Sequence, residues 1–239
     1  MLMDGKELAR DIKAKIKAEI DDIKRIYNVN PTVASILVGE DPASQVYLNS
    51  QIKSYQDLGI GVQKYFFSKE ISEAYLLNLI DKLNKDTEVD GIMINLPLPP
   101  QISATKVLNR IKLIKDVDGF KAENLGLLFQ NNEDFISPST PAGIMELIKG
   151  YKIDLEGKDV VVIGRSNIVG KPVAALVLNS HGTVTICNSH TKNLKEKTKT
   201  ADVLISAVGK PKFITADMVK EGAVVIDVGI NRVNGKLEG

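Results

Sequence analysis

Residues 160–172 read VVVIGRSNIVGKP, and this stretch decides how the second half of the chain folds. A run of β-branched residues ends at Gly164, and Gly170 opens the predicted helix that follows. A strand, a glycine turn and a helix N-terminus together form a site for a dinucleotide pyrophosphate, because free backbone amides and the positive end of the helix dipole face the anion. The spacing differs from G-x-G-x-x-G, so a tight strand-to-helix connection without a ligand stays an alternative.

The next predicted strand, TVTIC at residues 183–187, bears on which dinucleotide would bind. In NAD-binding proteins an acidic residue about 20 residues after the glycines commonly binds the ribose 2′-hydroxyl. Here Asn188, Ser189, His190 and Thr191 follow the strand, and none of them is acidic. The guanidinium of Arg165 and the hydroxyl of Ser189 would instead suit a 2′-phosphate, so the sequence favours NADP.

Strands and helices alternate along the whole chain, which predicts an α/β fold with parallel sheets covered on both faces. Two further strands in the second half end at Gly209 and Gly229, at carboxyl ends where such sheets bind ligands, although both glycines could simply turn the chain. In the first half the pattern predicts helices over 8–27, 42–58 and 71–86 and strands over 32–39, 62–67 and 89–95. Asp41 and Pro42 are typical of a helix start. A helix over 141–151 connects a first domain, 1–140, to a second, 141–239.

The composition excludes several classes of protein. Of the 239 residues 44% are hydrophobic, and 31 basic side chains balance 30 acidic ones, so a general nucleic-acid or membrane-surface binder is not expected. The apolar runs are too short to span a bilayer. A single cysteine, Cys187, rules out an internal disulfide framework and predicts a cytoplasmic protein; with two histidines it leaves little for a metal site.

Polar residues of the first half are predicted to gather at the carboxyl ends of its strands. Tyr47 and Gln51 are four residues apart and share one helix face, and Asn95 ends the third strand before a proline-rich loop. Asp116 and Asp118 follow in KDVDGF. Taken singly, each of these residues is more often structural than functional, and an aspartate before glycine is common in turns.

Taken together, the motifs identify a resemblance that covers nearly the whole chain. The sequence resembles the bifunctional 5,10-methylenetetrahydrofolate dehydrogenase/methenyltetrahydrofolate cyclohydrolase family in VGEDPASQVYLNS, GIMINLPLP, KDVDGF, TPAGIMELI, VVVIGRSNIVGKPVAALVL, GTVTICNSHT, ADVLISAVGKP and GAVVIDVGIN. The resemblance implies two α/β domains around a cleft, the second a Rossmann-type NADP-binding domain, and a homodimer. It implies oxidation of methylenetetrahydrofolate to methenyltetrahydrofolate in one-carbon metabolism with NADP as hydride acceptor, then hydrolysis to 10-formyltetrahydrofolate.

The resemblance also implies roles for individual residues. Tyr47 would stack on the folate ring system, and Asp118 would bind the amino group and ring nitrogens of the pterin. NADP would be contacted by Gly164, Arg165, Ser166, Ser189 and Ile230.

The chain departs from the family pattern in three places. Gln51 stands where a lysine is usual, and Asn95 stands where a glutamine is usual. A proline- and glycine-rich segment expected about 25 residues after DVGIN does not appear before Gly239, so a C-terminal segment is expected to be missing from this sequence.

Gln51 bears on the two chemical steps differently. Hydride transfer depends mainly on aligning the substrate with the cofactor. Hydrolysis needs a group that moves protons, and a glutamine amide does not titrate; general acid–base catalysis is typically worth about 10²–10⁴-fold. Lys53, two residues on, points to a different side of the helix. The sequence therefore predicts a dehydrogenase with weak or absent cyclohydrolase activity.

Three alternatives stay open at this point. In a fully bifunctional enzyme, Gln51 and Asn95 would have co-adapted and a bound water would carry the proton. A non-catalytic folate- or nucleotide-binding protein would be expected to have lost its cofactor motifs, yet GRSNIVGKP and DVGIN are intact. Another Rossmann dehydrogenase, such as a shikimate-type enzyme, finds no support in KDVDGF or the N-L-P-L-P loop.

Overall fold

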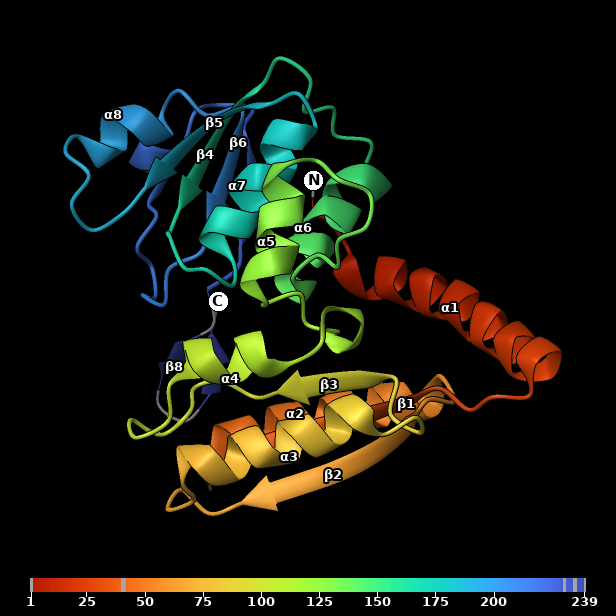
Figure 1. Cartoon of the computed structure of the whole chain (residues 1–239). Helices are drawn as coiled ribbons and strands as arrows, with labels where there is room; N and C mark the ends of the chain where they lie inside the picture. The colour runs from red at the N-terminus through yellow and green to blue at the C-terminus, as the bar shows by residue number, and fades with distance from the viewer. Residues whose placement is uncertain (1, 40–41, 230, 234–235, 239) are drawn as a thin grey trace. The chain divides into compact units, whose positions relative to one another are not determined.

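The structure, a computed structural model, describes residues 2–39, 42–229, 231–233 and 236–238 (Figure 1). Contacts within the chain divide it into two compact units, Met1–Glu123 and Asn124–Gly239, called unit 1 and unit 2 below. Each unit contains a parallel sheet with helices, as expected for an α/β fold. The domain boundary near residue 140 stays a prediction.

Unit 1 is built on a three-stranded parallel sheet in the order β2-β1-β3. Its strands are β1 (Thr32–Val38), β2 (Gly61–Phe67) and β3 (Gly91–Ile94), and its helices are α1 (Gly5–Tyr27), α2 (Pro42–Asp57), α3 (Glu73–Lys85) and α4 (Ala104–Arg110), with a 3₁₀ turn, η1 (Leu113–Lys115). Alternate residues of β1 point to opposite faces of the sheet. Ile36 packs on one face with α3 and α4, and Leu37 packs on the other with α2.

The helix ends of unit 1 follow from local chemistry. The side chain of Asp4 accepts hydrogen bonds from the first-turn amides of α1, and Asn28 ends that helix in the left-handed conformation. Ser72 caps α3 in the same way as Asp4 caps α1. The helix predicted after Pro42 is confirmed, whereas Asp41, its expected N-cap, lies outside the described residues.

Lys115 is a buried cation that closes the C-terminal end of α3. Its Nζ donates to the carbonyl oxygens of Leu83, at 2.8 Å, and Asp86, at 2.6 Å. Burial lowers the pKa of this lysine, and neighbouring Lys112 adds to that effect. The carbonyl groups at a helix end have no partners within the helix, so Lys115 fills a role that a capping residue would otherwise take.

Replacing Lys115 by methionine is expected to destabilise unit 1 by about 1–3 kcal/mol, because two carbonyl groups would be left in a part-buried place without a donor. Urea unfolding followed by circular dichroism measures the change. Lys112→Met, at an exposed position three residues earlier, is the matched control and should change the free energy of unfolding little. Equal effects of the two substitutions would contradict this role for Lys115.

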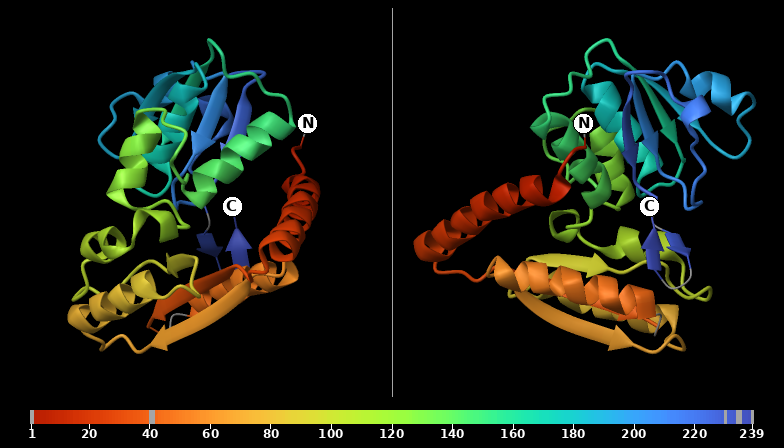
Figure 2. Two further views of the ribbon diagram at one scale, coloured as in Figure 1. Left: turned by 45° about the vertical axis from the view of Figure 1, so that its right-hand side comes forward. Right: turned by 180° about the vertical axis from the view of Figure 1, so that it is seen from behind.

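Unit 2 is built on a four-stranded parallel sheet in the order β5-β4-β6-β7, whose strands lie side by side in Figure 2. Its strands are β4 (Asp159–Ile163), β5 (Thr183–Cys187), β6 (Val203–Ser206) and β7 (Val224–Asp227), and its helices are α6 (Ser139–Gly150), α7 (Gly170–Asn179) and α8 (Leu194–Thr198), with a 3₁₀ turn, η2 (Ala216–Met218). A separate antiparallel pair, β8 (Asn231–Val233) and β9 (Lys236–Glu238), follows. The helix α5 (Ala122–Phe129) crosses from unit 1 to unit 2.

The sequence-based prediction identifies all the long elements and misses short ones. Helices α4, α5 and α8 span only seven, eight and five residues, too few to show a helical period. Residues 119–140, where the periodicity fades, contain α5. No helix among the described residues is long and apolar enough to cross a membrane.

Candidate active site

The turn between β4 and α7 lies so close to other backbone that two of its residues must be glycine. Gly164 has φ +128°, and a Cβ added there would lie 2.7 Å from the carbonyl oxygen of Ala207. A Cβ on Gly170 would lie 2.2 Å from the carbonyl oxygen of Gly164. A side chain at Gly164 would therefore displace the backbone that follows β6, and a side chain at Gly170 would displace the turn that leads into α7.

Ser166 holds this turn together. Its hydroxyl accepts hydrogen bonds from the backbone amides of Val169, at 3.1 Å, and Gly170, at 3.4 Å, and its carbonyl accepts from the amide of Lys171 at 3.1 Å. The amides of the first turn of α7 are thus organised by one exposed serine. In this backbone cradle three amides already donate to Ser166, so its attraction for a phosphate comes from the positive end of the helix dipole.

Arg165 and Ser189 lie at the ends of neighbouring strands. The register of β4 and β5 pairs Ile163 with Cys187, so Arg165 and Ser189 are each two residues beyond a paired position. Both side chains are exposed. The parallel register therefore places these two phosphate-compatible groups at the same edge of the sheet.

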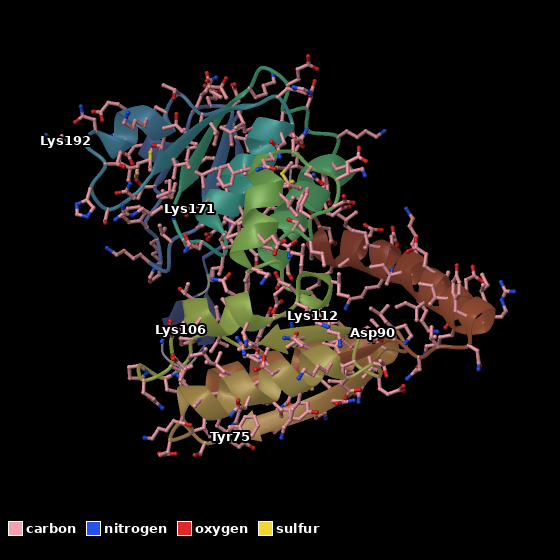
Figure 3. All side chains as sticks on the ribbon, viewed as in Figure 1. Tyr75, Asp90, Lys106, Lys112, Lys171 and Lys192 are labelled. Carbon is pink, nitrogen blue, oxygen red and sulfur yellow. The ribbon has the colours of Figure 1, made fainter. Side chains whose placement is uncertain are left out.

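The two segments that carry Arg165 and Ser189 contain no negative side chain. Residues 164–171 and 188–193 contain no acid, and both segments carry an exposed lysine, Lys171 and Lys192 (Figure 3). The Nζ atom of Lys171 donates to the side-chain oxygen of Asn167 at 2.7 Å. The two segments therefore suit an anionic ligand such as a dinucleotide phosphate.

Gly229, at the end of β7, also has a steric reason to be glycine. A Cβ there would lie 2.1 Å from the carbonyl oxygen of Val208, and its amide donates to the carboxylate of Asp227 at 3.1 Å. Close approach of backbone thus accounts for Gly229 without a ligand. Ile230, expected to contact the cofactor, lies outside the described residues.

In unit 1, α2 presents a polar stripe of three residues spaced four apart, Tyr47, Gln51 and Tyr55. Tyr47 is 62% exposed, whereas Gln51 is half-buried. The side-chain oxygen of Gln51 is buried and has no hydrogen-bond partner. Lys53, two residues along, is exposed, as the helical geometry predicts.

Asp118 lies beside β3 and has an unusual carboxyl group. Asp116 makes an isolated parallel bridge with Ile92, so the chain runs alongside β3, and the backbone N–H of Ile94 donates to the Asp118 carboxylate. Burial, with a smaller contribution from the charge of Asp116, raises the pKa of Asp118 to about 7. A carboxyl group that titrates near neutral pH is typical of functional sites.

Asp116 has a structural role in the same loop. It is almost fully buried, and its carboxylate accepts hydrogen bonds from the backbone amides of Phe120, at 3.3 Å, and Lys121, at 2.8 Å. Asp116 therefore shapes the loop that carries Asp118.

Electrostatic coupling joins the stripe on α2 to Asp118. Burial and then the Asp118 charge raise the pKa of Tyr47, and burial followed by the charges of Asp118 and Tyr47 raises the pKa of Tyr55 to about 12. The three side chains therefore lie within electrostatic reach of one another. Tyr55 is absent from the sequence-based prediction, although its position four residues after Gln51 could have indicated it.

Asn95 is nearly buried, and its amide is already engaged. Both its backbone N–H and its Nδ2 donate to the carbonyl oxygen of Ile36 on β1, at 2.9 and 3.1 Å. The side chain thus fastens the end of β3 to β1. It stands at the start of the loop that contains the cis peptide bond between Leu96 and Pro97.

A hollow of about 390 Å³ opens elsewhere on unit 1, lined by Leu37, Gly39, Gln45, Leu48, Asn49, Phe66, Phe67 and Ser68. None of the predicted site residues lines it. No group of three metal-binding side chains is found within the described residues.

Known proteins match this chain over its whole length. Residues 3–118 match the catalytic domain, and residues 138–239 the NAD(P)-binding domain, of the tetrahydrofolate dehydrogenase/cyclohydrolase family. The bifunctional protein FolD of Fusobacterium nucleatum is 87% identical, with 100% of this chain and 84% of that protein covered.

Two solved structures extend the comparison. The bifunctional FolD enzyme of Campylobacter jejuni is 44% identical, with a TM-score of 0.97, covering 100% of this chain and 85% of that one. The Trypanosoma brucei methylenetetrahydrofolate dehydrogenase-cyclohydrolase, solved with an NADP cofactor and an inhibitor, is 30% identical, with a TM-score of 0.95 and coverage of 100% and 84%. From its matched domains and from relatives this similar, the chain belongs to the tetrahydrofolate dehydrogenase/cyclohydrolase family.

Proposed function

We propose that this protein oxidises 5,10-methylenetetrahydrofolate to 5,10-methenyltetrahydrofolate with NADP, and that it hydrolyses the product weakly or not at all. The observation that carries the first part is the glycine cradle between β4 and α7, with Arg165 and Ser189 at neighbouring strand ends and no acid beside them. A 2′-phosphate finds cationic and hydroxyl partners there, whereas the carboxylate that would bind a free ribose 2′-hydroxyl is missing.

Four residues of unit 1 would handle the folate. The ring of Tyr47 is exposed enough to stack on the pterin and its neighbouring ring, and the carboxylate of Asp118 would accept hydrogen bonds from the pterin amino group and ring nitrogen. Gln51 would offer a neutral amide to the substrate. Asn95 would act indirectly, because its hydrogen bond to Ile36 of β1 holds the end of β3 in place.

When bound, NADP accepts the hydride, so the residues of this chain need only align the substrate and exclude water. Gly164, Arg165, Ser166 and Ser189 would hold the phosphates, and Ile230 would add a contact. This alignment asks for no group that titrates.

Hydrolysis makes the further demand that a proton be moved during water attack and ring opening. Gln51 cannot meet it because an amide does not titrate. Asp118 titrates near neutral pH, but as the pterin ligand its carboxylate is occupied. In the fully bifunctional alternative, a bound water beside Gln51 and Asn95 would have to carry the proton.

A cytoplasmic homodimer completes the proposal. In the described part of the chain, β5 lies at one edge of the unit 2 sheet and leaves Thr183, Thr185 and Ile186 exposed, Ile186 to 41%. An exposed edge strand with an apolar side chain is a surface that a second copy could cover.

Purified protein is expected to reduce NADP in the presence of methylenetetrahydrofolate, and to do so more efficiently than it reduces NAD. Because the chain contains no tryptophan, NADPH fluorescence can be followed without transfer from indole groups. In the same sample, decay of methenyltetrahydrofolate should stay close to its spontaneous rate. Absence of NADPH binding would instead favour a non-catalytic binding protein.

A further inference from the structure

Two buried side-chain oxygens in the described part of the chain lack a hydrogen-bond partner, Ser35 Oγ and Gln51 Oε1. Buried polar groups are satisfied in the great majority of cases, so each such atom calls for an explanation. Both of these atoms belong to unit 1. Gln51 is also the residue on which the proposed weakness of hydrolysis depends.

Ser35 lies in the layer between the sheet and α2. It alternates with Val33 and Leu37 along β1, and both of these pack in the cluster that contains Leu48 and Ile52 of α2. Its register partner on β3 is Met93. Ser35 is fully buried, so its hydroxyl is enclosed in this layer.

Tyr55 reaches the same place from α2. Its hydroxyl donates to the sulfur of Met93 at 3.8 Å, a weak acceptor for a phenol. Side chains on a helix lean toward its N-terminus, so Tyr55 extends over the turn that carries Gln51. The influence of Tyr47 and Asp118 on its pKa agrees with that direction.

We propose that Tyr55 and Ser35 are positioning residues for Gln51: when substrate is bound, the hydroxyl of Ser35 donates to Tyr55 Oη and the hydroxyl of Tyr55 donates to Gln51 Oε1. This inference rests on the proposed function. Two hydrogen bonds satisfy both unpartnered oxygens and give Tyr55 an oxygen acceptor in place of a thioether.

The consequence for Gln51 is a fixed orientation. Because Oε1 is held from the buried side, the amide group of Gln51 cannot flip. Its Nε2 then faces the substrate as a neutral hydrogen-bond donor. A lysine would supply its own three donors and needs no such support. A phenol is protonated at neutral pH, and burial raises the pKa of Tyr55 to about 12, so its proton stays available to Gln51 at alkaline pH as well.

The test is a double-mutant cycle on dehydrogenase activity with NADP and methylenetetrahydrofolate. Tyr55→Phe, which removes one hydroxyl, is expected to lower kcat/KM about fivefold to tenfold, the usual effect of one hydrogen bond. In the Gln51→Ala background the same substitution should change kcat/KM less than twofold. Ser35→Ala should likewise lower kcat/KM in the wild-type background and change it little in the Gln51→Ala background, which tests the proposal at a second residue.

Tyr65→Phe is the matched control, because the Tyr65 hydroxyl donates to Gln63 at 2.8 Å on β2 and the side chain packs against the opposite face of the sheet. It should leave kcat/KM unchanged in both backgrounds. Equal losses from Tyr55→Phe with and without Gln51, or no loss in either, would overturn the inference. A wild-type protein without dehydrogenase activity would overturn the proposed function instead.

Discussion

Gln51→Lys is expected to raise the rate of methenyltetrahydrofolate hydrolysis by about 10²–10⁴-fold over the wild-type protein, the range that general acid–base catalysis typically contributes. The reason is that the substitution places a titratable amine at a half-buried position of α2, four residues from Tyr47. Partial burial favours the neutral amine, which can accept a proton near neutral pH. Oxidation of methylenetetrahydrofolate should be retained, because hydride transfer depends on alignment.

The measurement is a paired assay of both steps, with hydrolysis corrected for the spontaneous rate. Gln56→Lys makes the same chemical change at an exposed position of the same helix and should leave hydrolysis at the wild-type level. If the wild-type protein already hydrolyses methenyltetrahydrofolate rapidly, and Gln51→Lys adds nothing, the assignment of weak hydrolysis to Gln51 is wrong.

Asp118→Asn is expected to lower kcat/KM for methylenetetrahydrofolate by about 10–150-fold, because hydrogen bonds to a charged group contribute about 1.5–3 kcal/mol. The same substitution should stabilise the free protein at pH 8. The pKa of Asp118 is raised to about 7, so folding favours the protonated form. The stability associated with that form is fully present below about pH 4 and is lost as the pH rises through about 7.

Urea unfolding at pH 5 and at pH 8 separates the two effects of this substitution. The gain from Asp118→Asn should be on the order of 1 kcal/mol or more at pH 8 and smaller at pH 5. Asp57→Asn, at the exposed end of α2, is the control and should not reproduce this pH dependence. A gain that is equal at both pH values would contradict a carboxyl group that titrates near neutrality.

Much of the cofactor edge of unit 2 follows from the sequence alone. The glycine turn after VVVIG and the absence of an acid after TVTIC indicate Arg165 and Ser189 in the sequence, and the register of the two strands places these residues at one edge of the sheet. Backbone periodicity is enough for this result, because it depends on where strands end and not on side-chain conformation.

The arrangement of the proposed folate-binding residues in unit 1 could not be predicted from the sequence. That Asn95 donates to the carbonyl of Ile36, and that Lys115 turns inward to the end of α3, depends on side-chain conformations that sequence periodicity does not encode. Tyr55 is not predicted as a site residue for a related reason. In a sequence, an aromatic residue on the inner face of a helix is indistinguishable from a core residue, and only the structure shows where its hydroxyl lies.

Lys115 also links the C-terminal end of α3 to the segment that carries Asp118. It stands three residues before Asp118, while its Nζ is bound to carbonyls at the end of α3. Loosening of that helix terminus would therefore loosen the segment that carries Asp118, the proposed pterin ligand, so local opening of α3 is expected to weaken folate binding. A substitution of Lys115, which is not expected to contact the folate, would in this way weaken folate binding.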